Sequence, residues 1–116
     1  MKIVLHIDDK ERWKNVKNNL DHLIKAQHDK NLDLCVEVVA NGDAVLNLKK
    51  DYSVLSDVDI QKGFDLKPTF SISACHNSMN RFGLTEDDIH SFIDIVPAGV
   101  LEIAKREEEG YSYIKP

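Results

Sequence analysis

The stretch TFSISACHNSMNRFG, residues 69–83, contains the change of pattern that decides the fold. Residues 69–74 alternate between apolar and polar side chains, which is typical of a β-strand. Residues 76–82 then favour a short helix, and Gly83 suits the position just after a helix C-terminus. Cys75 is therefore expected where a strand ends and a helix begins.

The same succession of strand and helix extends in both directions from this stretch. Upstream, we expect strands at residues 2–7 and 33–40, an amphipathic helix between them from about residue 8 to residue 28, and a short helix after residue 43. Downstream, we expect a strand at residues 91–96, a helix with Pro97 in its first turn that runs to Gly110, and an edge strand at residues 111–114. Residues 52–67 are compatible with one more helix.

Strands that alternate with helices predict right-handed crossovers and a parallel sheet. The expected fold class is α/β, with three layers: a mostly parallel five-stranded sheet flanked by helices on both faces. The length of 116 residues matches one domain that spans residues 1–116.

The composition argues against several classes of protein. The net charge of −5 and the absence of a basic stripe argue against nucleic acid as a partner. No stretch is apolar enough to cross a bilayer, and the apolar run near the N-terminus is too short for a signal peptide. Two cysteines do not make the disulfide framework of a small secreted protein. We therefore expect a cytoplasmic protein without a membrane partner.

Reactive groups in parallel sheets gather at the carboxyl ends of the strands. This rule selects four short stretches, which are Ile7-Asp8-Asp9, Asn41-Gly42-Asp43, Cys75-His76-Asn77-Ser78 and Pro97-Ala98-Gly99. We interpret the two aspartates as capping residues of the following helix, and the alternative is acid–base or metal chemistry at the end of the first strand. None of the stretches carries a phosphate-binding glycine motif or a metal-ligand spacing, so no cofactor and no metal are expected.

Cys75 is the best candidate for chemistry because of its position before a helix. Backbone N–H groups at a helix N-terminus lower the pKa of a cysteine thiol to roughly 7, which makes it a nucleophilic thiolate. Asn77 and Ser78 offer further hydrogen bonds, and His76 would assist if protonated. The alternative is that Cys75 is a small buried apolar residue. Cys35, in the middle of an apolar strand, is expected to be structural.

One histidine lies inside the first predicted strand. His6 is expected to be a hydrogen-bonded residue of the core or of a pocket rim rather than a metal ligand. The two tyrosines at 111 and 113 lie in the predicted edge strand and are candidates for an interface.

Four segments together resemble the DsrE/DsrF-like family of small sulfur-relay proteins: residues 73–79, 83–84, 96–100 and 110–116. The resemblance implies a flavodoxin-like (YchN-like) fold and homo-oligomers, often trimers or hexamers. It also implies a cysteine that accepts sulfur as a persulfide, and Cys75 falls at that position. His76, Asn77, Asn41 and Gly99 are expected near it.

The leading hypothesis is a cytoplasmic sulfur carrier, sulfurtransferase-like if it is an enzyme. It would hold sulfane sulfur on Cys75 between a donor and an acceptor protein. The rival hypothesis is a non-catalytic module that binds a small ligand or mediates oligomerisation. A third is a redox sensor that uses the same thiol. The reactivity of Cys75 separates the first hypothesis from the second.

Overall fold

The computed structural model describes residues 1–51 and 70–116. The helix suggested for residues 52–67, and Thr69 at the start of the third predicted strand, lie outside the described residues. The described elements are β1 (Lys2–Ile7), η1 (Lys10–Arg12), α1 (Trp13–Lys30), β2 (Cys35–Ala40), η2 (Gly42–Leu48), β3 (Phe70–Cys75), α3 (His76–Arg81), η3 (Glu86–Asp88), β4 (Asp94–Val96), α4 (Gly99–Glu108) and β5 (Ser112–Ile114).

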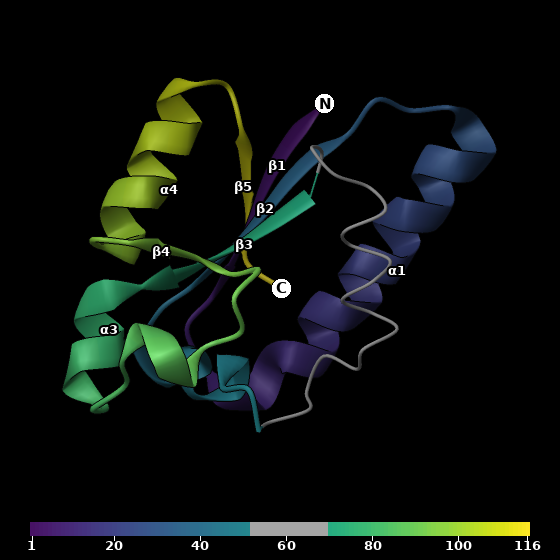
Figure 1. The fold of residues 1–116 in the computed structure, drawn as a ribbon. Helices are drawn as coiled ribbons and strands as arrows, with labels where there is room; N and C mark the ends of the chain where they lie inside the picture. Colours follow the sequence, from purple (N-terminus) through teal and green to yellow (C-terminus); the bar gives the residue numbers. More distant parts are fainter. Residues whose placement is uncertain (52–69) are drawn as a thin grey trace.

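In the described part of the chain, five strands form one sheet in the order β4-β3-β2-β1-β5 (Figure 1). Every pair of neighbouring strands is parallel. The predicted α/β class with a mostly parallel sheet is therefore confirmed. The predicted edge position of the last strand is also confirmed, since β5 pairs with β1 alone.

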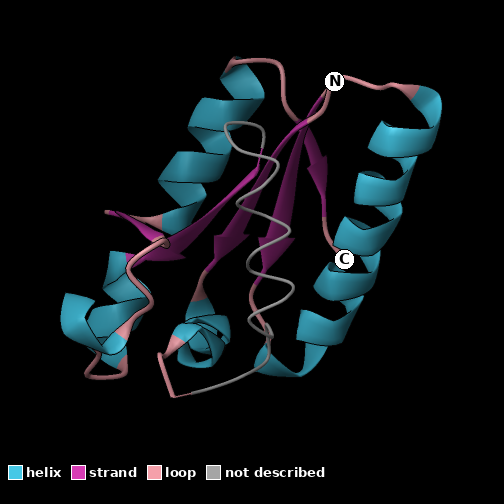
Figure 2. Ribbon diagram, turned by 45° about the vertical axis from the view of Figure 1, so that its right-hand side comes forward, coloured by secondary structure: helices cyan, strands magenta, loops and turns pink. Residues whose placement is uncertain are grey.

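The two faces of the sheet are covered by different helices (Figure 2). Alternate residues of β1 point to opposite faces, as in any strand. Ile3, Leu5 and Ile7 belong to the main core, together with residues of α1. Val4 belongs to a smaller cluster with Val39 and Ile103 of α4. Helices thus flank both faces, and the three-layer arrangement is flavodoxin-like.

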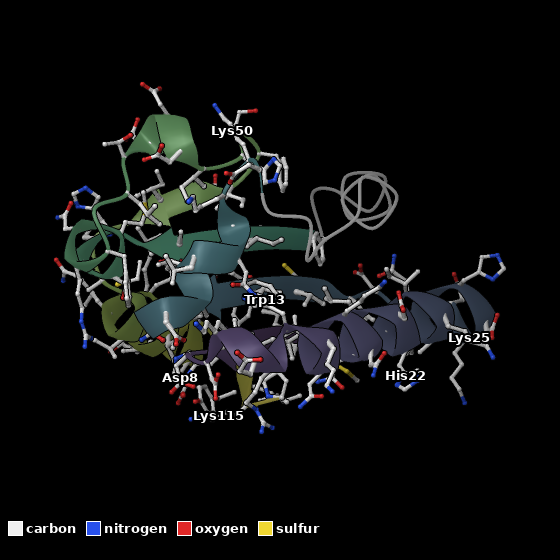
Figure 3. The ribbon with its side chains drawn as sticks, turned by 90° about the horizontal axis from the view of Figure 1, so that it is seen from below. Asp8, Trp13, His22, Lys25, Lys50 and Lys115 are labelled. Carbon is white, nitrogen blue, oxygen red and sulfur yellow. The ribbon has the colours of Figure 1, made fainter. Side chains whose placement is uncertain are left out.

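Helix α1 follows the predicted amphipathic pattern. Trp13, Val16 and Leu20 are buried against the sheet, whereas His22 and Lys25 extend from the outer side of the helix (Figure 3). The helix begins later than expected because a short 3-10 turn precedes it. Asp9 caps that turn by accepting a hydrogen bond from the Glu11 N–H at 2.9 Å. The capping role predicted for this residue is confirmed.

The fourth strand is shorter than predicted. Only Asp94–Val96 pair with β3, whereas residues 91–93 form a turn in which the Ile93 N–H donates to the His90 carbonyl. Ile93 is nevertheless buried, so the apolar residue at this position correctly indicates burial in the core but not a β-strand. Similarly, α4 begins at Gly99 after the N-cap residue Ala98, so Pro97 lies before the helix rather than in its first turn.

No helix among the described residues is long and apolar enough to cross a membrane.

Candidate functional site

Cys75 is the last residue of β3 and the N-cap residue of α3. The strand brings it to the carboxyl edge of the sheet, and the chain turns there into the helix. Its side chain is only 5% exposed. Cys75 is a free thiol, and so is Cys35. Cys35 is the first residue of β2, not a mid-strand residue as predicted. Cys35 therefore lies at the amino end of the parallel strands, and Cys75 lies at their carboxyl end.

Hydrogen-bond donors from two helices, α3 and α4, act on the Cys75 thiol. Burial raises the pKa of the thiol, but hydrogen bonds from the Ser78 hydroxyl and from the backbone N–H groups of Ser78, Gly99 and Asn77 lower it, and the net effect is a lowered pKa. Ser78 and Asn77 belong to the helix that follows the cysteine, whereas Gly99 starts α4. Stabilisation of the anion therefore depends on tertiary structure as well as on local sequence.

The Ser78 hydroxyl connects Cys75 to the neighbouring turn after β2. It accepts a hydrogen bond from the Gly42 N–H at 2.8 Å, and it is one of the groups that lower the pKa of the Cys75 thiol. Gly42 has a positive φ of 57°, and a Cβ atom there would lie 2.9 Å from the Asp8 carbonyl oxygen. Only glycine fits this position without moving backbone. The predicted turn chemistry thus has a specific cause, which is the close approach of two chain segments.

Asn41 is the lateral neighbour of Cys75. The register of β2 and β3 pairs Ala40 with Ala74, and Asn41, which has extended backbone angles, is the next residue after β2. Its side chain lies against Gly99, because a Cβ atom on that glycine would be 3.1 Å from the Asn41 Cβ and 3.4 Å from its Nδ2. The structure therefore brings Asn41, Gly99 and Cys75 together.

Two further side chains hold Asn41. His6 of β1 places its Nε2 2.9 Å from the Asn41 Oδ1 and its Nδ1 2.6 Å from the Tyr113 hydroxyl of β5. Because an amide oxygen only accepts, Nε2 carries the hydrogen of the neutral ring and the tyrosine hydroxyl donates to Nδ1. The hydrogen bonding expected of His6 is confirmed. The sequence predicts Tyr113 only as an interface residue and not as a residue of this site. Its link to the site depends on the pairing of β5 with β1, which no local pattern reveals.

Two predicted pocket residues lie further out. His76, at the first position of α3, has an exposed side chain, and so does Pro97. The contribution of α3 to the sulfur comes from backbone N–H groups and from Ser78 rather than from an imidazole.

The capping role predicted for Asp8 is wrong, since Asp9 is the N-cap residue. The Asp8 carboxylate lies at the same edge of the sheet and binds Lys115, with an Oδ2–Nζ distance of 3.1 Å (Figure 3). The hydrogen bond and the positive charge of Lys115 lower the pKa of Asp8.

A buried polar network lies between the sheet and α4. Glu37 of β2 is only 3% exposed, and it accepts hydrogen bonds from the Ser73 hydroxyl at 2.8 Å and from Arg106 Nε at 2.7 Å. Burial, together with the nearby carboxylate of Glu102, raises the pKa of Glu37. The ion pair ties β2 to α4, the helix that presents the Gly99 N–H to Cys75.

Within residues 1–51 and 70–116, no group of three or more His, Cys, Asp or Glu side chains could hold a metal ion. The donors that lower the pKa of the Cys75 thiol are all neutral.

Comparison with known proteins agrees with this architecture. A protein of unknown function from Methanobacterium thermoautotrophicum, MTH1491, has a similar structure with a TM-score of 0.81 and 30% sequence identity, covering 99% of this chain and 98% of that one. A protein of unknown function from Bacteroides thetaiotaomicron, BT1422, has a similar fold with a TM-score of 0.69 and 14% identity, covering 99% and 94%. No curated protein matches the chain.

The family comparison is more specific. The model of the DsrE/DsrF-like family matches residues 19–116, which include all the strands that the structure describes except β1, and the whole stretch around Cys75. The chain belongs to the DsrE/DsrF-like family.

Proposed function

We propose that this protein carries sulfane sulfur as a persulfide on Cys75 and passes it to an acceptor thiol. The observation that supports this most directly is the set of hydrogen-bond donors around the Cys75 sulfur, which lowers the pKa of the thiol despite its burial. Membership of a family of sulfur-relay proteins agrees with it.

The proposed reaction is two successive exchanges at one sulfur atom. The Cys75 thiolate attacks the outer sulfur of a donor persulfide, R–S–SH. The bond between the two donor sulfurs breaks, Cys75–S–SH forms, and R–S⁻ leaves. An acceptor thiolate then attacks the outer sulfur of Cys75–S–SH, takes that sulfur, and releases the Cys75 thiolate. Neither step changes the net oxidation state of the pair of reactants, so no external oxidant or reductant is needed.

The donors around Cys75 suit both steps. A lowered pKa raises the fraction of nucleophilic thiolate near neutral pH, and it also makes Cys75 a better leaving group when sulfur moves on. Backbone N–H groups and the Ser78 hydroxyl stabilise the anion without adding a charge that would attract other anions.

The low exposure of Cys75 favours the rival function. A residue that is 5% exposed offers little surface to an incoming sulfur donor, and it suits a module that binds a small ligand or a partner without chemistry. The two functions differ in whether the sulfur reacts.

We also infer that the protein is a homo-oligomer, a trimer or a hexamer, and that it acts in the cytoplasm, where thiols stay reduced. Large apolar side chains remain exposed near the site in the single chain, at Val100 and Leu101 of α4 and at Tyr113 and Ile114 of β5. Apolar and aromatic groups of this kind are typical of subunit interfaces.

The test uses the Cys35→Ala variant, which leaves Cys75 as the one thiol. We expect a midpoint for alkylation against pH well below 8.5, and a mass gain of one sulfur after incubation with a small persulfide. The Cys75→Ser variant should fold and gain no sulfur. A midpoint at or above 8.5 without sulfur uptake would establish the non-catalytic module instead.

A further inference from the structure

The Asn41 side-chain amide has an open donor beside Cys75. Its Oδ1 accepts from His6, whereas its Nδ2 has no acceptor among the residues that the structure describes. An amide nitrogen carries two hydrogens, and Asn41 is only half-buried, so these donors are open to an incoming group. The Nδ2 would lie 3.4 Å from a Cβ atom on Gly99, and the backbone N–H of that glycine lowers the pKa of the Cys75 thiol.

The direction of this donor is fixed by two other strands. His6 lies on β1 and Tyr113 on β5, and their rings lie against each other with centroids 5.7 Å apart. Because the Asn41 Oδ1 only accepts, the His6 Nε2 carries the hydrogen, and the Tyr113 hydroxyl donates to Nδ1 at 2.6 Å. That hydrogen then holds the Asn41 oxygen, and a half-turn of the amide would keep a bond to His6 only if the ring hydrogen moved to Nδ1 and the Tyr113 hydroxyl became the acceptor. The amide nitrogen thus stays on the Gly99 side.

We propose that Asn41 donates a hydrogen bond to the outer sulfur carried on Cys75, and that His6 and Tyr113 are positioning residues that orient Asn41. This inference rests on the proposed sulfur-carrier function and assigns a residue to the carried atom. The backbone donors and Ser78 contact the sulfur of the cysteine itself. A persulfide extends one sulfur further and needs a second donor, which the neighbouring strand supplies.

The geometry gives Asn41 a role in both exchanges. When the Cys75 thiolate attacks, negative charge spreads over the sulfurs in line, and a donor placed beside the outer sulfur stabilises that charge. A neutral amide does so without repelling an incoming thiolate or persulfide anion, whereas a carboxylate at the same place would repel both.

The experiment measures sulfur transfer from glutathione persulfide to Cys75, and from loaded Cys75 to a small thiol, in the Cys35→Ala background. The Asn41→Ala variant should slow transfer roughly tenfold to a hundredfold, the effect of losing one hydrogen bond to a charged group. The Asn41→Asp variant has nearly the same shape and keeps an oxygen for His6. It should be slower still, because it replaces the donor by a negative charge.

A double-mutant cycle tests whether Tyr113 acts through Asn41. The Tyr113→Phe variant removes one hydroxyl from a side chain that is 42% exposed, so it should fold even if the Asn41 variants do not. In the parent background, Tyr113→Phe should lower the transfer rate roughly threefold, which corresponds to the loss of one weak hydrogen bond. In the Asn41→Ala background, Tyr113→Phe should cause no further loss. A merely structural role for the tyrosine would give equal losses in both backgrounds.

The outcomes separate this inference from the proposed function. Transfer at the parent rate in Asn41→Ala, or equal effects of Tyr113→Phe in both backgrounds, would overturn the inference and leave the carrier function standing. Failure of the parent protein to take up any sulfur would overturn both.

Discussion

The Ser78 hydroxyl interacts with two groups, the Gly42 N–H and the Cys75 thiol. In Ser78→Ala the Cys75 sulfur loses its only side-chain donor among those that lower its pKa. We therefore expect the alkylation midpoint of Cys75 to move to higher pH, and the rate of alkylation at neutral pH to fall severalfold. Rates measured with a small alkylating reagent across a pH series would show both effects.

Ser91→Ala is the matched control for this change. Ser91 is an exposed serine in the turn before β4, so removal of its hydroxyl should leave the midpoint where it was. An unchanged midpoint in Ser78→Ala would mean that the backbone donors alone set the acidity of Cys75.

The lowered pKa of Cys75 also predicts how stability depends on pH. An unfolded thiol titrates near 8.5, above the folded value, so between the two the unfolded state binds more protons and the free energy of unfolding rises with pH. This contribution is complete above the unfolded pKa and is lost as the pH falls through the folded pKa. Denaturant unfolding at several pH values should show the rise in Cys35→Ala and not after an additional Cys75→Ser change. The same slope in both proteins would contradict it.

At the scale of residues, the sequence predicted the parts of the site that are local. Cys75, Asn77 and Ser78 are close in the chain, and the step from strand to helix is enough to predict that backbone N–H groups point at the sulfur. The Gly99 and Tyr113 contributions come from the pairing of strands distant in sequence. Gly99 could be predicted as a site residue because all parallel strands present their carboxyl ends at one edge of the sheet. The contact of Tyr113 with His6 depends on the order of the strands in the sheet, and the periodicity of the sequence does not encode that order.

The turn between β2 and η2 provides a prediction at the scale of elements. Gly42 and Gly83 both have positive φ, 57° and 70°. A Cβ atom at Gly83 would meet nothing within 4 Å, whereas one at Gly42 would lie 2.9 Å from the Asp8 carbonyl oxygen. Gly83→Ala should cost about 1 kcal/mol from backbone strain alone, and Gly42→Ala should cost clearly more.

Denaturant unfolding of the two glycine variants measures the difference. Gly42→Ala should also slow the alkylation of Cys75, because the Gly42 N–H holds Ser78. Equal stability losses for the two variants would show that the approach of this turn to β1 is looser than the structure indicates.

The ion pair between β2 and α4 provides a second prediction at this scale. Arg106→Met leaves the buried Glu37 carboxylate without its cation, which should lower the free energy of unfolding by about 3 kcal/mol at neutral pH. The loss should shrink in acid, because the pKa of Glu37, already raised by burial and by Glu102, rises further without Arg106 and the group becomes neutral.

The Glu37→Gln/Arg106→Met double variant controls for lost packing. Glutamine has the same shape, can still accept from Ser73, and carries no charge. The double variant should therefore recover much of the stability and lose the dependence on pH. A double variant less stable than Arg106→Met would contradict a cost that comes from the unpaired charge.

Predictions of elements from the sequence were most accurate where one face of the element is buried against the sheet. Helix α1 matches its apolar pattern, and so do β1, β2 and β3. The error at β4 has the same origin, because the apolar residues 92 and 93 are drawn into the core from a turn, and burial alone does not distinguish a turn from a strand. Residues 52–67 stay a prediction.

At the scale of the whole molecule, the exposed apolar residues of α4 predict the assembly state. Val100 and Leu101 are 68% and 62% exposed in the single chain. If they lie in the proposed interface, Val100→Asp should reduce a trimer or hexamer to smaller species, whereas Lys105→Asp, also exposed on α4, should do so much less. Light scattering coupled to size-exclusion chromatography measures the mass directly. A monomeric parent protein would remove the interface from the proposal.

The position of β5 in the sheet has a consequence for how the molecule assembles. His6 and Tyr113 are 107 positions apart in the sequence, yet their contact forms only when β5 pairs with β1. Contacts of such long range are closed late and at a high entropic cost, and during synthesis the first strand leaves the ribosome long before the last. Until then the His6 ring lacks its contact with Tyr113 and is held only by Asn41. A nascent chain thus acquires its cysteine and the backbone donors of α3 well before it acquires the alignment of the amide next to them.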